Sequence, residues 1–208
     1  MAPVNMLFIA GPHSVGKTTI ARQLQDNGFL HIETGDIVRK KHQEVAPELE
    51  FHTWASGQHH KFDRFIADVI LNARAQIEQS RGVLQDVLVI GNRQIGGIDY
   101  LLQNIPPLDG RPNLIIYVEA DEQILFHRHV ERPGRAVDGL TFEKFKEEVL
   151  GFDTRMGLEK IRDRAHLIVY NEGEMSCCVD CVAKFLESNG YHFHGRAIEG
   201  NVRNLEIR

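Results

Sequence analysis

A glycine-rich segment near the N-terminus has the residue types that bind phosphate. Gly11, Gly16, Lys17 and Thr18 match the pattern GxxxxGK[ST] within the sequence GPHSVGKTT. Glycines let the backbone turn tightly so that successive N–H groups face a phosphate, and the N-terminus of a following helix adds positive potential. The lysine supplies charge near the β- and γ-phosphates, and the threonine hydroxyl can bind magnesium. The residues expected to hold a nucleoside triphosphate are Gly11, Ser14, Val15, Gly16, Lys17, Thr18 and Thr19.

A carboxylate and an arginine follow the next apolar run, in the sequence ETGDIVR, residues 33–39. Asp36 could order magnesium or accept a hydrogen bond from a hydroxyl, and Arg39, about one helical turn later, could hold an acceptor phosphate. The alternative interpretation is an Asp that caps a helix and an Arg exposed to solvent. We expect Thr34, Asp36 and Arg39 to bind a second substrate, with Asp36 also a catalytic residue and magnesium ligand.

A second arginine follows the third apolar run, VLVI, in the sequence Gly91-Asn92-Arg93. Gly91 permits close approach of a ligand to the backbone, and Arg93 can bind a phosphate or carboxylate through parallel hydrogen bonds. A structural ion pair is the alternative for Arg93 alone. Its occurrence together with Arg39 favours an anionic acceptor.

Three more arginines, Arg128, Arg132 and Arg135, lie where a helical segment ends in a Pro-Gly loop. Arg128 and Arg132 are four residues apart and therefore share a helix face. Such a cluster suits a lid that closes on the phosphates, neutralises their charge and excludes water. The alternative is a basic helix end stabilised by the helix dipole.

Apolar runs that alternate with helical periodicity must position these residues. The expected strands are 6–10, 29–32, 87–90, 114–118 and 167–170. The expected helices are 17–27, 62–79, 98–102, 121–128, 142–150 and about 176–187. This alternation predicts an α/β fold, a three-layer α/β/α arrangement of about five mainly parallel strands. Ligands bind such sheets beyond the carboxyl ends of the strands, where each motif lies.

The length of 208 residues, of which 42% are apolar, fits one domain over residues 1–190. Residues from about 36 to 80 exceed one crossover helix and predict a helical insert, and a lid is expected at about 128–139. No role is apparent for the tail, 191–208. The net charge of −5 disfavours nucleic acid as a partner without excluding it, and leaves the oligomeric state open.

The apolar runs are too short to cross a bilayer and no signal-type segment is present, so we expect a cytoplasmic protein without membrane contact. Three cysteines within five residues do not make a disulfide framework. Cys177, Cys181, His192 and His194 could form a zinc site, although the cysteines also fit the apolar face of a helix.

Together these motifs resemble the nucleoside monophosphate kinase group of P-loop proteins. TGDIVR is similar to the TGDxxR segment of adenylate kinases, and GNR stands where they carry a glycine-to-arginine element. The order of GDxxR, GxR, an arginine-rich lid and a final NEG resembles an archaeal adenylate-kinase-like family related to dephospho-coenzyme A kinase. The resemblance implies that Lys17, Arg128 and Arg135 stabilise the transferring phosphoryl group and that Arg39 and Arg93 hold the acceptor. It also places Asn171 and Glu172 near the adenine.

One position departs from that resemblance. Related kinases carry an acidic residue before the glycine of the third-strand motif, where it orders the water around magnesium, but this chain has Ile90. We therefore expect either that Asp36 takes the metal role or that catalysis is impaired. The expected activity is phosphoryl transfer from MgATP to a small acceptor, such as a nucleoside monophosphate or related nucleotide. The alternatives are a kinase of a modified base or hydroxyl in nucleic acid, and a nucleotide-binding regulator with little turnover.

Overall fold

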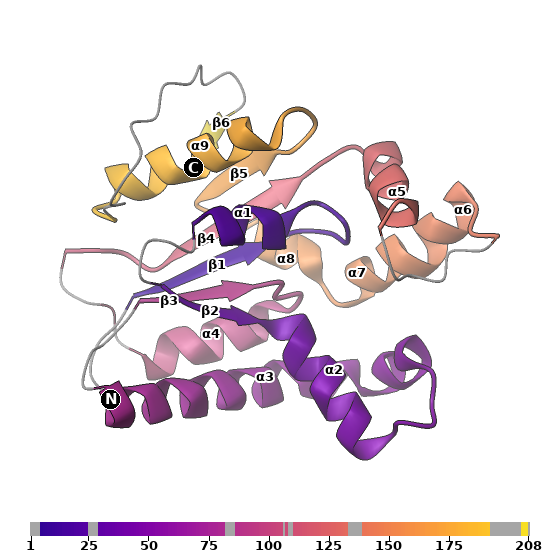
Figure 1. Cartoon of the computed structure of the whole chain (residues 1–208), viewed down its shortest axis with the longest axis horizontal. Helices are drawn as coiled ribbons and strands as arrows, with labels where there is room; N and C mark the ends of the chain where they lie inside the picture. Colours follow the sequence, from indigo (N-terminus) through magenta and orange to yellow (C-terminus); the bar gives the residue numbers. More distant parts are fainter. Residues whose placement is uncertain are drawn as a thin grey trace.

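In the computed structural model, six strands form one sheet in the order β2-β3-β1-β4-β5-β6 (Figure 1). The structure describes residues 5–24, 29–81, 86–105, 107, 110–132, 139–191 and 205–207. The strands are β1 (Met6–Ala10), β2 (Leu30–Glu33), β3 (Val87–Ile90), β4 (Leu114–Glu119), β5 (Leu167–Tyr170) and β6 (Leu205–Ile207). The first five are parallel and β6 is antiparallel to β5, which confirms the mainly parallel α/β fold.

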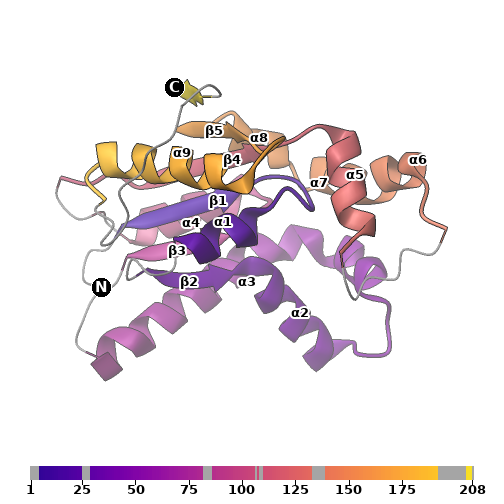
Figure 2. The same ribbon diagram turned by 45° about the horizontal axis from the view of Figure 1, so that its top comes forward.

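Helices cover both faces of the sheet, as Figures 1 and 2 show. The helices are α1 (Lys17–Gln23), α2 (Thr34–Val45), α3 (Phe51–Arg81), α4 (Ile95–Asn104), α5 (Glu122–Val130), α6 (Phe142–Lys144), the π-helical η2 (Phe145–Leu150), α7 (Gly151–Arg155), α8 (Leu158–Arg162) and α9 (Met175–Ser188). One apolar cluster joins the sheet to α1 and α9, and a second joins its other face to α3, α4 and α8. The result is the predicted three-layer arrangement.

The central strand β1 positions the glycine-rich segment in the middle of the sheet. It pairs with β3 on one side and β4 on the other, and all five of its residues are fully buried. A strand covered on both faces needs apolar side chains in both directions, which explains the unbroken run MLFIA. Beyond its carboxyl end, α2 lies on one side and α5 to α7 on the other (Figure 1).

Several elements differ from those expected. Helix α3 begins at Phe51, because Phe51, Ala55 and Phe62 pack with Val38 of α2 in a third apolar cluster. The expected helix at 142–150 continues through π-helical η2 into α7, and α8 follows it. The tail, which carries no clear apolar period, contributes β6 to the edge of the sheet.

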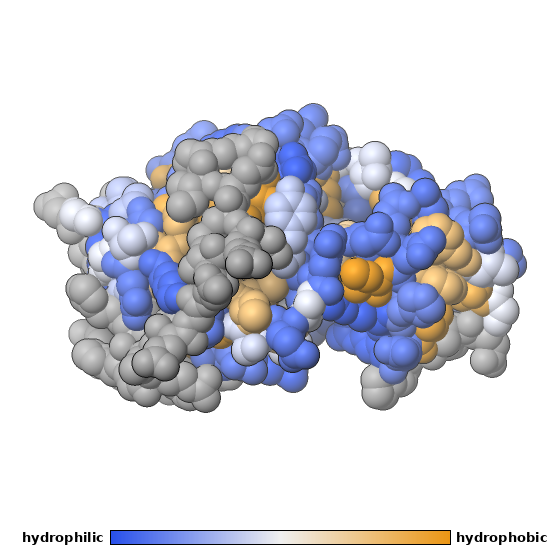
Figure 3. Space-filling view, turned by 90° about the horizontal axis from the view of Figure 1, so that it is seen from above, coloured by the Kyte–Doolittle hydropathy of each residue, from blue (hydrophilic) through white to orange (hydrophobic). Residues whose placement is uncertain are grey.

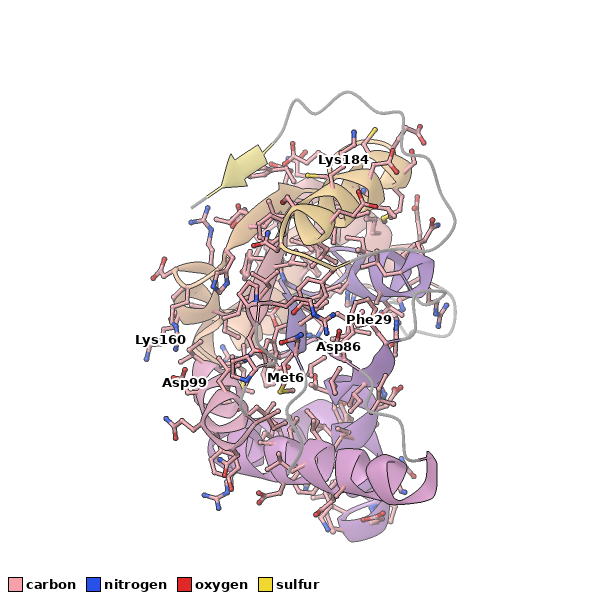
Figure 4. The ribbon with its side chains drawn as sticks, turned by 90° about the vertical axis from the view of Figure 1, so that its left-hand side faces the viewer. Met6, Phe29, Asp86, Asp99, Lys160 and Lys184 are labelled. Carbon is pink, nitrogen blue, oxygen red and sulfur yellow. The ribbon has the colours of Figure 1, made fainter. Side chains whose placement is uncertain are left out.

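Polar contacts join the strands at the opposite end of the sheet, where the strands begin; Figure 4 views the molecule from this end. Asp86, directly before β3, accepts hydrogen bonds from Arg111 Nη1 at 2.7 Å and from the backbone N–H of Asn5 at 3.1 Å. Met6 and Phe29, at the starts of the neighbouring strands, lie at the same end (Figure 4). Asp86 therefore joins the amino ends of the strands and is remote from the glycine-rich segment.

The face seen from above is largely hydrophilic, with apolar residues in separate patches (Figure 3). Among the described residues, Val45 and Leu49 are the large apolar side chains most open to solvent. No helix in the described ranges is long and apolar enough to span a membrane.

Candidate functional site

The glycine-rich segment forms a tight loop around the side chain of Lys17. Lys17 Nζ donates hydrogen bonds to the carbonyl oxygens of Gly11 at 2.8 Å and Pro12 at 2.6 Å. Gly11 and Gly16 have φ values of 143° and 95°, in the region that favours glycine. A Cβ at Gly11 would lie 2.2 Å from the carbonyl oxygen of Val118, so close packing against β4 also requires glycine there.

Asn171, the residue directly after β5, forms a hydrogen bond with this loop. Its side chain is completely buried and donates a hydrogen bond to the carbonyl oxygen of Val15 at 2.8 Å. Arg128 Nη1 in turn donates to the carbonyl oxygen of Asn171 at 2.9 Å. Asn171 thus links the loop to α5, and its contact with an adenine stays a prediction.

A buried network joins the loop to α7 and to the end of β3. Asp153 Oδ2 accepts hydrogen bonds from the backbone N–H of His13 at 2.9 Å and from His13 Nδ1 at 3.0 Å. Arg93 Nη1 donates to Asp153 Oδ1, and Arg93 Nη2 lies 3.1 Å from His13 Nε2. Because the guanidinium can only donate, His13 Nε2 must accept, which assigns the ring proton to Nδ1.

Burial and the neighbouring charges determine the protonation state of each group in this network. Burial and the Arg93 charge lower the pKa of His13 to about 3, so the ring is neutral at physiological pH. Burial raises the pKa of the Asp153 carboxyl, but Arg93 and His13 outweigh that effect and hold its pKa well below the ordinary value. The network therefore contains one carboxylate and one guanidinium.

Sequence reasoning missed His13 and Asp153 as partners. His13 occupies a variable position of the motif, and Asp153 lies 140 residues further along the chain. The available signal was a carboxylate that lies three residues before Met156 and directly after Phe152, on the side of the helix that carries these apolar residues. The predicted structural ion pair of Arg93 is formed, and its role toward an acceptor stays a prediction.

The loop opens into a cavity of about 550 Å³ whose lining has a polar part, called here the polar end, and an apolar part that belongs to the third apolar cluster, called here the apolar end. The polar end is lined by predicted site residues: Ser14, Gly16, Lys17, Thr18, Thr19, Thr34, Arg39, Arg93 and Arg128. Arg132 lines it as well. The other end is lined by apolar side chains of α2, α3 and α7 and the residue after α7: Val38, Phe51, Ala55, Phe62, Ile66, Phe152 and Met156.

Five described residues that were predicted to lie at the site do not line this cavity: Gly11, Val15, Asp36, Asn171 and Glu172. Arg135 and half of the predicted lid, residues 133–138, lie outside the described residues. Asp36 has a side chain 70% exposed and pairs with Arg39 at 2.5 Å, so the structure places it in solvent on α2. Its predicted part in catalysis and metal binding stays untested.

Glu33 is the carboxylate that lies beside Thr18, and sequence reasoning did not select it. Thr18 Oγ1 donates a hydrogen bond to Glu33 Oε2 at 3.3 Å, and both residues line the cavity. Hydroxyl and carboxylate oxygens are ligands that suit magnesium, which is bound through one or two carboxylates together with substrate phosphates. The donor set at the polar end therefore fits this ion.

Lys17 is tuned by the same surroundings. Burial and the nearby Arg93 charge lower the pKa of its ammonium group to about 7. A phosphate chain placed in the loop would favour the protonated form, because opposite charges attract strongly in a buried site. Binding of a phosphate chain in the loop would therefore be coupled to protonation of Lys17.

The cysteines lie on α9. Cys178 and Cys181 are buried and Cys177 is exposed, and burial raises the pKa of Cys178 to about 11. Within the described ranges, no group of three or more His, Cys, Asp or Glu could hold a metal ion, and His192 and His194 lie outside those ranges.

The sequence of this chain matches one family profile and is similar to the sequences of two other proteins. The profile of a family described as "AAA domain" matches residues 10–146, more than half of the chain. A UPF0200 protein of Pyrobaculum aerophilum is 28% identical over 171 residues, which cover 81% of this chain and 88% of the relative. An adenylate kinase of Prochlorococcus marinus is 30% identical over 138 residues, covering 64% and 71% of the two chains.

Solved kinases share the fold. A shikimate kinase from Bacteroides thetaiotaomicron has a TM-score of 0.56 at 12% identity, covering 88% of this chain and 98% of its own. A sugar kinase from Janibacter sp. has a TM-score of 0.57 at 15% identity, covering 92% and 100%. The sequence matches, the loop around Lys17 and the parallel sheet agree, and the chain belongs to the AAA domain family, in the nucleoside monophosphate kinase-like group of P-loop proteins.

Proposed function

We propose that this protein transfers the γ-phosphoryl group of MgATP to the phosphate of a nucleoside monophosphate. The observation that carries the proposal is the composition of the cavity, in which the phosphate-binding loop and five arginines line one space together with a cluster of aromatic and apolar side chains. A nucleobase offers a flat face to such side chains, whereas a sugar or a carboxylated ring with many hydroxyls would leave them poorly matched.

On the donor side, the loop N–H groups and Lys17 would hold the phosphates, and Arg128 and Arg132 line the same end. Arg128 is anchored by its hydrogen bond to the carbonyl oxygen of Asn171, the residue whose side chain binds the loop. Fixed cations of this kind stabilise charge on the transferring group without reorganising during the reaction. Thr18 and a carboxylate would hold magnesium, which would supply positive charge to the phosphates.

On the acceptor side, Arg39 and Arg93 would hold the monophosphate. A guanidinium has five N–H donors, and the contacts of Arg93 with Asp153 and His13 use only some of them. Arg39 has a side chain 56% exposed, so it can exchange Asp36 for a phosphate without a large loss of solvation.

The chemistry needs positioning more than proton transfer. An oxygen of the acceptor phosphate attacks the γ-phosphorus, the bond from that phosphorus to the β-γ bridging oxygen breaks, and the products are ADP and a nucleoside diphosphate. The attacking oxygen carries no proton near neutral pH, so the site requires no general base. A hydroxyl acceptor, by contrast, would have to lose its proton.

A panel of acceptors with γ-labelled ATP tests the proposal. We expect label transfer to one or more nucleoside monophosphates and none to ribose 5-phosphate, which has the phosphate without the base. Dephospho-coenzyme A, shikimate, a hexose and an oligonucleotide with a 5′-hydroxyl complete the panel. Transfer to one of these hydroxyl acceptors alone would refute the monophosphate assignment.

A nucleotide-binding regulator with little turnover is the second candidate, favoured by Ile90 at the usual position of a carboxylate. It predicts that the protein binds ATP with normal affinity and labels no member of the panel. Slow release of inorganic phosphate that no acceptor accelerates would support it.

A further inference from the structure

The last residue of β2 is a carboxylate, Glu33, and the last residue of β3 is apolar, Ile90. Glu33 and Ile90 are paired directly in the parallel register. Because side chains alternate between the two faces of a sheet, residues paired in register point to the same face. Ile90 packs in the apolar cluster that contains Ile20 and Ala21 of α1, so Glu33 also begins on the α1 side.

The Glu33 side chain reaches the first turn of α1. Its Oε2 atom accepts the hydroxyl hydrogen bond of Thr18, 15 residues away in sequence. In P-loop proteins this hydroxyl is a magnesium ligand, and the second protein group is a carboxylate at the end of a strand. Thr34, the next residue, donates from Oγ1 to the carbonyl oxygen of Ile90 at 3.1 Å, which ties the two strand ends together.

Asp36, the other candidate carboxylate, lies in a different environment. Its side chain is mostly exposed on α2 and pairs with Arg39, and it does not line the cavity. Moving it to Thr18 would require breaking that pair and reorienting the first turn of α2. Glu33 needs no such change.

We propose that Glu33 orders magnesium at the triphosphate site, so that a carboxylate on β2 takes the place left by Ile90 on β3. This inference rests on the proposed binding of MgATP. One carboxylate beside Thr18 is sufficient, because magnesium keeps several waters and takes its remaining ligands from the phosphates. The departure at Ile90 is then a relocation of the carboxylate and not its loss.

The test compares the affinity for a non-hydrolysable ATP analogue with and without Mg²⁺, by titration calorimetry. We expect Mg²⁺ to tighten binding to the wild-type protein, and Glu33→Gln to reduce that enhancement about tenfold. The affinity without Mg²⁺ should be unchanged or slightly higher, because a negative charge near the phosphates is removed. Glu44→Gln, an exposed carboxylate on α2 that pairs with Lys41, is the matched control.

A charge relocation makes the test sharper. In the Glu33→Gln background, Ile90→Asp places the carboxylate on the paired position and should restore the enhancement. Thermal melting checks that each variant is folded, and Mn²⁺ binding followed by electron paramagnetic resonance gives a direct readout of the ion. Retention of the full Mg²⁺ enhancement in Glu33→Gln, or its loss in Asp36→Asn alone, would overturn the proposal.

These readouts separate the two proposals. If Mg²⁺ does not change the affinity of the wild-type protein for the ATP analogue, the proposed role of Glu33 is wrong. Mg²⁺-dependent binding that Glu33→Gln weakens, without label transfer to any acceptor, would support Glu33 and count against the kinase function alone.

Discussion

Asp153 holds His13 through two hydrogen bonds to one oxygen, from the backbone N–H and from the imidazole Nδ1–H. The same carboxylate pairs with Arg93, and its side chain is only 4% exposed. The phosphate-binding loop is therefore fastened to α7 and to the end of β3 at a single point. A substitution of Asp153 should therefore alter the positions of both His13 and Arg93 at the polar end of the cavity.

Replacing Asp153 with asparagine should destabilise the fold. Asp153→Asn removes the charge that balances Arg93, and breaking a buried ion pair from one side costs about 3–5 kcal/mol. Urea denaturation measures the free energy of unfolding. Asp163→Asn, on the exposed end of α8, is the control and should change it by less than about 0.5 kcal/mol. Equal stabilities of the two variants would contradict the network.

Removing Arg39 should weaken binding of the acceptor and spare ATP. A hydrogen bond to a charged group contributes about 1.5–3 kcal/mol, so Arg39→Ala should raise the KM for the acceptor about ten- to a hundredfold. Steady-state kinetics with each substrate varied in turn measures both constants. Lys40→Ala, the exposed neighbour on α2, should leave them unchanged. An unaltered acceptor KM in Arg39→Ala would remove Arg39 from the acceptor site.

Nucleotide binding should take up a proton above neutral pH. The free protein has Lys17 with a pKa of about 7, below its ordinary value, so the amine is mostly neutral at pH 8.5 and charged at pH 6. Bound phosphates raise that pKa, and binding at pH 8.5 should therefore absorb about one proton, with none absorbed at pH 6. The affinity should fall as pH rises through 7.

Calorimetry in buffers of different ionisation enthalpy measures this proton uptake. Lys17→Arg is the control, because arginine stays protonated throughout this range and should abolish the uptake wherever binding persists. Uptake that is identical at the two pH values would show that Lys17 is not the titrating group.

The single tryptophan should report on the apolar end of the cavity. The Trp54 ring lies 5.6 Å from that of Phe62 and 6.3 Å from that of Phe51, measured between centroids, and both phenylalanines line the cavity. A nucleobase that displaces water there should shift the Trp54 emission to shorter wavelength. Ribose 5-phosphate should produce a smaller shift. Calorimetric binding of a monophosphate without any spectral change would place its base elsewhere.

Local patterns in the sequence were enough to predict the sheet and the donor site. Each of the five parallel strands lies within two residues of its expected bounds. Four of them are largely buried and carry nearly unbroken apolar runs, as strands covered on both faces require, whereas β2 is a partly buried edge strand. The loop from Gly11 to Thr18 could also be predicted from the sequence. Its positive φ values require glycine at particular positions, and these positions and the lysine lie within one short segment. The antiparallel β6 was not, since three residues within a polar tail carry no period.

The remaining features depend on segments that only the folded chain brings together. His13 meets Asp153 across 140 residues, and nothing local to either residue specifies the other. The pairing of Glu33 with Ile90 depends on the order and register of β2 and β3, which are set by packing of the whole sheet. The sequence by itself determined that a triphosphate loop is present, and the tertiary structure decided which carboxylate stands beside it, because that choice is a matter of register between distant strands.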